Sequence, residues 1–139
     1  MVFKRYGNKY LLRLERGEDI VESIKFLCKE ENIKLGTVSG IGAVDKAKIG
    51  YFEIATKEYH SKELTGDMEI VGLCGNISEM DGEVYLHLHI SLGNENYNVL
   101  GGHLNYARIS ATGEIVIDIM DGRVNREFNE EIGLNLIRF

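Results

Sequence analysis

Three of the four histidines in this 139-residue chain have a spacing that suits a metal ion. His87 and His89 lie two positions apart in the apolar run Val84–Leu92, and in a strand such a pair points to one face, about 6.5–7 Å apart. His103 follows fourteen positions later, so a hairpin can return it to the first pair. Three neutral imidazoles with an open fourth position form a recognised catalytic zinc set. We therefore predict a metal site at these histidines, although imidazole also suits copper, nickel, iron and cobalt.

A structural role is the alternative for each histidine. A single histidine on a sheet face is more often held by hydrogen bonds than by a metal, and the pairing of two at this spacing favours a ligand role. His60 stands alone after Glu58-Tyr59. We expect His60 to be a solvated surface residue.

The sequence does not place carboxylate, serine or threonine side chains near the three histidines. Glu69, Glu114 and Asp118 lie in or beside apolar strands, where a carboxylate near a metal can serve as a general base. Nothing in their spacing places them near the histidines, so we expect solvated or interface positions. Ser91 and Thr112 lack the G-x-S-x-G context of a nucleophile. The catalytic residues stay unassigned.

The glycine-rich segment Gly36–Ala43 does not predict a phosphate loop, because it lacks the Lys-Ser/Thr pair and no helical pattern follows it. A bulge or close strand packing is the expected role. Gly101-Gly102 is expected to form a turn that lets the backbone pass close to a neighbour. We predict no organic cofactor site.

The elements that position these residues include one helix, expected over Glu18–Glu31. Gly17 is a permitted N-cap, the first turn is acidic, and Asn32 suits a left-handed position after the last turn. The apolar residues form one helical stripe: Ile20, Val21, Ile24, Leu27 and Cys28.

Nearly everything else predicts strands, separated by turn residues at Gly66-Asp67, Asp81-Gly82, Gly93-Asn94, Thr112-Gly113 and Asp121-Gly122. Met68–Leu73 is apolar on both faces apart from Glu69, which favours a subunit interface because one helix cannot cover both faces. The expected strands are Tyr10–Leu14, Leu35–Val44, Ala47–Ile54, Glu58–Leu64, Met68–Ile77, Val84–Leu92, Tyr97–Leu100, Leu104–Ala111, Glu114–Met120, Val124–Phe128 and Leu134–Ile137.

Composition fits one globular domain spanning residues 1–139, with 44% hydrophobic and 27% charged residues and no proline.

Cys28 and Cys74 are expected to be reduced core residues. The first residues are too polar for a signal peptide and no apolar run reaches 18 residues, so we expect a soluble, cytoplasmic protein without a membrane partner. A net charge of −6 argues against bulk-charge binding of nucleic acid.

Five segments together resemble a known family, the plants-and-prokaryotes-conserved (PPC) domain, which is AT-hook-associated in plants. The resemblance extends over roughly residues 5–137. The segments, in family order and spacing, are Arg16–Ile20 (RGEDI), Val38–Ala43 (VSGIGA), Gly66–Ile70 (GDMEI), Leu86–Leu92 (LHLHISL) and Gly101–Leu104 (GGHL).

The resemblance implies an α+β (α/β) domain with a mostly antiparallel sheet, one main helix and assembly as a homotrimer. Many prokaryotic members keep the H-x-H and G-G-H histidines, which look like a zinc site, and His87, His89 and His103 match that pattern. Such members are commonly assigned to DNA binding. This chain has no Arg-Gly-Arg core for the minor groove, although a trimer can gather Lys46 and Lys48 into a patch. Its basic residues are scattered along the chain, among them Lys4, Arg5, Lys9, Lys46, Lys48, Lys57, Lys62, Arg108, Arg123 and Arg126.

Two functions follow as alternatives. The first is a trimeric zinc-binding module in regulation, with DNA or a regulatory protein as partner. The second is a zinc-dependent small-molecule enzyme, a hydrolase or lyase, with an open metal position in a carboxylate-lined pocket near the subunit interface.

Overall fold

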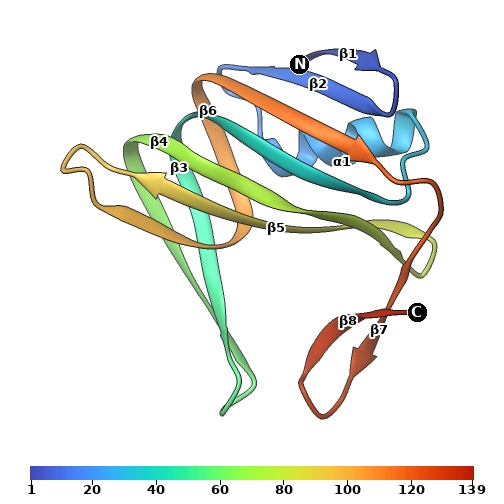
Figure 1. Cartoon of the computed structure of the whole chain (residues 1–139). Helices are drawn as coiled ribbons and strands as arrows, with labels where there is room; N and C mark the ends of the chain where they lie inside the picture. The colour runs from blue at the N-terminus through green and yellow to red at the C-terminus, as the bar shows by residue number, and fades with distance from the viewer.

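The computed structural model covers residues 1–139 and contains one helix and eight strands (Figure 1). The helix is too short and too polar to cross a membrane. The elements in chain order are β1 (Val2–Tyr6), β2 (Lys9–Glu15), α1 (Ile20–Glu30), β3 (Gly36–Glu53), β4 (Glu58–Met80), β5 (Glu83–Gly93), β6 (Val99–Ile119), β7 (Asn125–Asn129) and β8 (Leu134–Arg138).

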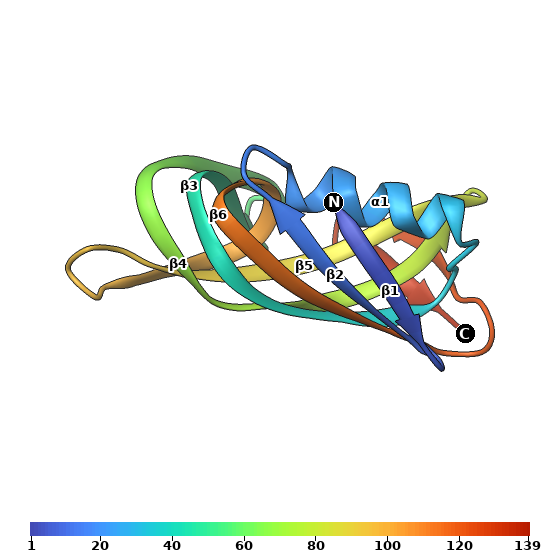
Figure 2. The same cartoon turned by 90° about the horizontal axis from the view of Figure 1, so that it is seen from above.

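The strands form one strongly curved, mostly antiparallel sheet in the order β1-β2-β6-β3-β4-β7-β8. β5 pairs with both β4 and β6, and β3 also pairs with both of them, so β3, β4, β5 and β6 close into a ring. Figure 2 shows α1 lying along the sheet on one side. The expected architecture, a mostly antiparallel sheet with one helix, is confirmed.

The core lies between α1 and the sheet, where 26 buried residues form one cluster. All five residues of the predicted helical stripe are buried in it. The predicted cap at Gly17 is wrong: Gly17 forms a turn with φ +91°, and Asp19 is the N-cap, because its carboxylate accepts the N–H of Glu22 at 2.8 Å. The same side chain accepts the Ala107 N–H at 3.0 Å, which joins the helix to β6. Asn32 has the predicted left-handed conformation, φ 52°.

Four predicted interruptions are absent, one of them at Gly101–His103 in β6, and β3, β4 and β6 are single long strands. Gly66-Asp67 and Thr112-Gly113 have the residue types of turns, but both lie inside strands. Asp45-Lys46, the predicted gap before Ala47, lies within β3 beside a register shift. Gly66 lies at the register shift between β3 and β4 with φ +107°, and the bulge there absorbs the irregular backbone. Gly113 pairs with Leu14 of β2 and with Gly42 of β3, which keeps β6 continuous. β1 is an additional strand that the sequence pattern does not predict.

Two hairpin arms extend from the body of the sheet (Figure 1). The first is the far end of β3 and β4, and the second is β7 with β8. The second arm is fastened to β4 by the Glu79 N–H, which donates to Val124 O at 2.9 Å. Near the tips, Lys57 Nζ of the first arm donates to Glu130 O of the second at 2.7 Å. The two arms therefore enclose the space between them.

The sheet face away from α1 carries uncovered apolar residues. Ile41 and Val71 are each 58% exposed, and Leu11 is 47% exposed. Together with Val116, which pairs with Leu11 in register, we call these residues the outer apolar face. Its exposure agrees with the two-sided apolar pattern of Met68–Leu73. The prediction that both cysteines lie in the core is wrong for Cys74, which is exposed on β4, whereas Cys28 is buried.

Candidate metal centre

The three predicted ligands lie together on two paired strands. His87 and His89 alternate with the buried Leu88 on β5, so both point away from the core. His103 of β6 is the direct cross-strand partner of His89. The ring centroids form a nearly equilateral triangle: 5.2 Å for His87–His89, 5.3 Å for His87–His103 and 5.7 Å for His89–His103.

Close backbone packing sets the position of His103. Gly102 pairs with Ile90, and a Cβ added to it would lie 2.5 Å from the Gly50 carbonyl oxygen of β3. His103 itself pairs with Gly50 in register. The prediction that Gly101-Gly102 forms a turn is wrong, because both residues lie in β6, but the predicted close backbone approach is confirmed. The absent side chain lets β3 and β6 place the imidazole beside its partners.

The donor set fits a transition metal. Bonds of about 2.0–2.1 Å at the tetrahedral angle put two ligand nitrogens about 3.3 Å apart, and the Nε2 atoms of His87 and His89 are 3.3 Å apart. One ligand nitrogen of each of the three rings lies within 4.8 Å of the others. Burial lowers the pKa of His87, and the charges of His103, Arg126 and His89 lower it further. Burial and His89 lower the pKa of His103. Neutral imidazole, the form that binds metal, is therefore favoured.

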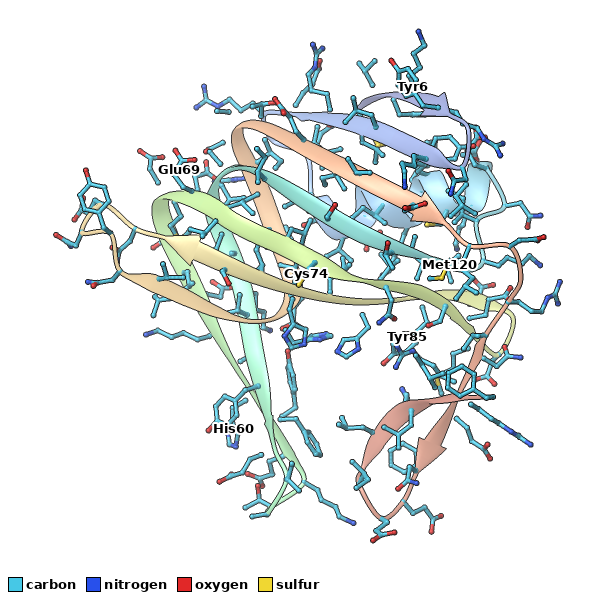
Figure 3. The ribbon with its side chains drawn as sticks, in the orientation of Figure 1. Tyr6, His60, Glu69, Cys74, Tyr85 and Met120 are labelled. Carbon is cyan, nitrogen blue, oxygen red and sulfur yellow. The ribbon has the colours of Figure 1, made fainter.

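The histidines line a cavity of about 520 Å³ between the two arms. Aromatic rings from β3, β4 and β5 and apolar side chains from β8 make up much of its wall, and no carboxylate lines it. Figure 3 shows Tyr85 on the side of the cavity toward β7 and β8, with Glu69 at the opposite end of the sheet. The lining residues are Gly50, Tyr51, Phe52, Tyr59, Tyr85, His87, His89, Gly102, His103, Arg126, Leu134, Asn135 and Leu136.

Arg126 of β7 also lines the cavity, although its position in the sequence does not mark it as a site residue. Its Nε donates to Ser78 Oγ at 2.9 Å and its Nη2 to Asn76 Oδ1 at 2.8 Å, and Asn76 is the cross-strand partner of His87. Its Nη1 donates to Asn135 O at 2.9 Å. The guanidinium also lies 4.7 Å from the centroid of the Tyr85 ring. In the sequence Arg126 is one of many scattered basic residues, and no local signal sets it apart.

His60, which was expected to be a solvated surface residue, makes side-chain contacts within the first arm. It lies on the first arm (Figure 3), where its ring stacks on Tyr51 at 5.2 Å between centroids. Its Nε2 is 3.2 Å from Glu53 Oε2 and 3.9 Å from Glu58 Oε2. This group lies near the strand turn with 42% of the His60 side chain exposed, so the expectation of a solvated position holds.

The three candidate general bases lie away from the histidines. Asp118 pairs with Lys9, and Glu114 lies beside Leu11 and Ile41 on the outer apolar face. Glu69 is an exposed residue of β4, paired in register with Gly93. Glu69 and Glu114 are exposed and Asp118 is half-buried, in agreement with the expected solvated positions. Within this chain, no carboxylate lines the cavity that contains the histidines.

Comparison with known proteins gives a family and several close structures. The family model described as the Plants and Prokaryotes Conserved (PCC) domain matches residues 1–121. A Bacteroides thetaiotaomicron structure, described as a “putative DNA binding protein”, is 39% identical with TM-score 0.97, covering 99% of this chain and 96% of that one. A “metal-containing protein” from Archaeoglobus fulgidus is 38% identical with TM-score 0.88, covering 100% and 99%. A plant- and prokaryote-conserved (PPC) protein from Pyrococcus horikoshii is 36% identical with TM-score 0.87, covering 99% and 95%. No curated protein matches the chain.

Proposed function

Because this chain belongs to the Plants and Prokaryotes Conserved domain family, we propose that it is a metal-binding module in which His87, His89 and His103 hold one zinc ion. The observation that carries the proposal is the convergence of the three imidazoles, with nitrogens within 4.8 Å of one another. The Archaeoglobus fulgidus relative, described as metal-containing, adds support. Zinc held by three imidazoles keeps one position open and supplies a Lewis acid to a ligand there.

The chain's own residues prepare this site for a ligand. The cavity lies between the two arms, and its aromatic walls provide apolar contact. Lowered pKa values keep His87 and His103 neutral at neutral pH. With no carboxylate on the cavity wall, the site favours ligand binding over hydrolysis by a general base. A small-molecule enzyme is the second candidate function, supported by the cavity itself.

Elemental analysis of the untagged protein tests the metal centre. We expect about one zinc per chain, lost in His89→Ala and in His103→Ala. His60→Ala is the matched control, because it removes an imidazole outside the cluster and should keep the metal. A wild-type protein that takes up no transition metal, or a His89→Ala variant with full metal content, would contradict the proposal.

We also propose that the chain is a single domain that assembles as a homotrimer in the reducing cytoplasm. Two free thiols agree with that compartment, and the outer apolar face offers a surface that another copy can cover. Light scattering should give a trimer mass for the wild type. Ile41→Asp should yield smaller species, whereas Tyr97→Asp, at a 94% exposed loop position, should not. A monomeric wild type would contradict the assembly.

DNA as a partner is supported by the description of the Bacteroides thetaiotaomicron relative. The charges of this chain favour it less, because Lys46 lies 3.7 Å from Glu63 and Arg108 lies 2.7 Å from Asp45. Fluorescence anisotropy with a short duplex at 50 and 200 mM salt tests the partner. Binding that falls steeply with salt would support DNA binding, and no binding at 50 mM would exclude it.

A further inference from the structure

Arg126 differs from every other arginine of the chain. It is half-buried, whereas the remaining six, Arg5, Arg13, Arg16, Arg108, Arg123 and Arg138, are exposed. No carboxylate lies within ion-pair distance of it, and all three of its hydrogen bonds go to neutral acceptors. Burial lowers its pKa, but a guanidinium remains charged in proteins. A half-buried cation without an acidic partner is costly, and an anionic ligand would offset that cost.

The hydrogen bonds of Arg126 fix its direction and leave part of it free. A guanidinium has five N–H groups, and Ser78, Asn76 and Asn135 together accept three of them. Two N–H groups remain, one on each terminal nitrogen, and the side chain lines the cavity. Paired terminal N–H groups suit the two oxygens of a carboxylate.

The rest of the cavity favours a ligand with an apolar part. Beside Arg126 and the histidines, the wall consists largely of aromatic rings, including Tyr85 and Phe52, and of Leu134 and Leu136. A volume of about 520 Å³ admits a small organic molecule. The chain as a whole carries a charge of −6, whereas the cavity wall has one cation, Arg126, and no carboxylate.

From these contacts we propose that the cavity binds a small organic carboxylate with an aromatic or branched apolar body. The acid group pairs with Arg126, and the body packs between the rings of the first arm and the leucines of β8. The inference deepens the proposed function, because the same cavity contains the three histidines and a bound metal would add to its positive charge.

Calorimetric titration with phenylacetate, and with phenylacetamide as its uncharged analogue, tests the proposal on metal-loaded protein. We expect phenylacetate to bind at least about tenfold more tightly than the amide, and Arg126→Gln to lose at least about tenfold in phenylacetate affinity. Arg138→Gln, which removes an exposed arginine paired with Glu127 at 3.0 Å, should bind as the wild type. Equal binding of acid and amide, or an unchanged affinity in Arg126→Gln, would overturn the proposal.

A second variant and a second anion separate a carboxylate site from a general anion site and from the metal centre. Arg126→Lys keeps the positive charge and loses the paired N–H donors, so it should bind phenylacetate with an affinity between those of wild type and Arg126→Gln. It also tests the proposal if Arg126→Gln fails to fold, and wild-type affinity in Arg126→Lys would show that the paired donors are not used. Tighter binding of inorganic phosphate than of phenylacetate would overturn the carboxylate class. A protein with full zinc content that binds no phenylacetate would refute this inference and leave the metal centre standing. If the protein cannot hold metal but binds phenylacetate through Arg126, the metal centre is refuted and the carboxylate site stands.

Discussion

Gly102→Ala should damage both the stability of the sheet and the metal centre. The added methyl group would lie 2.5 Å from the Gly50 carbonyl oxygen, whereas ordinary contacts begin at 3.4 Å. β6 and β3 must therefore separate by about 0.9 Å at this point, or the oxygen must turn away from its place in the sheet. Over-packing of this kind costs about 1–3 kcal/mol of unfolding free energy.

The same displacement reaches the ligand set, because His103 is the next residue and pairs with Gly50. A shift approaching 1 Å is large beside metal–nitrogen bonds of about 2.0–2.1 Å. Loss of ligand positioning typically costs about 10–100-fold in metal affinity, and we expect zinc binding to weaken within that range.

Urea unfolding of the metal-free protein and competition titration with a chelating zinc dye measure the two effects separately. Gly72→Ala is the matched control, since a Cβ there meets no atom within 4 Å. That variant should keep its zinc affinity and be unchanged or up to about 1 kcal/mol more stable. If Gly102→Ala matches wild type in both measurements at equal protein concentration, the close approach of β3 and β6 does not position His103.

Three further outcomes follow from the same contacts. Asp19→Ala removes the acceptor for N–H groups of α1 and β6, and urea unfolding should show a loss of about 2–4 kcal/mol in unfolding free energy. A loss under about 0.5 kcal/mol would contradict the role of Asp19 as the helix cap. Burial raises the pKa of the Cys28 thiol to about 12 from 9.0. Because the unfolded chain then loses this proton at lower pH than the folded chain, the unfolding free energy should fall by up to about 1.4 kcal/mol per pH unit between pH 9 and 12. Cys28→Ala should reduce that slope, and an identical slope would show that the Cys28 thiol does not cause it. If free zinc exceeds the Kd about 1,000-fold before chelation, a chelator should lower the Tm of the wild type by about 10 °C and leave the Tm of His89→Ala unchanged. Equal Tm shifts in both proteins would count against the metal site.

The histidine cluster was predictable because alternation along a strand is a local rule. His87 and His89 needed only the two-residue period, and a hairpin connects them to His103. The helix was predictable for the same reason, since its stripe of five buried residues is a periodic pattern within one segment. Local rules failed at its start, where the carboxylate of Asp19, held also by β6, is a better cap than Gly17.

Features that depend on distant pairing could not be predicted. Gly66 and Gly113 look like turn residues, but β4 continues through a bulge at Gly66, and pairing with β2 and β3 keeps β6 continuous at Gly113. Cys74 sits in an apolar run, but its exposure depends on which face of β4 is left uncovered. Arg126 acquires its place through acceptors about fifty positions earlier, Ser78 and Asn76, which no sequence period connects to it.

The second arm has a consequence for how this protein can diversify. β7 and β8 lie beyond residues 1–121, the part that the family model matches, yet they supply one wall of the cavity. The histidines belong to the ring of core strands, whereas the arm is attached by few bonds, chiefly those of Glu79 and Arg126. Under the proposed function, substitution in the arm would change which molecule the cavity selects while the three histidines are retained. Ligand selectivity and metal binding would then depend on separable stretches of one short chain.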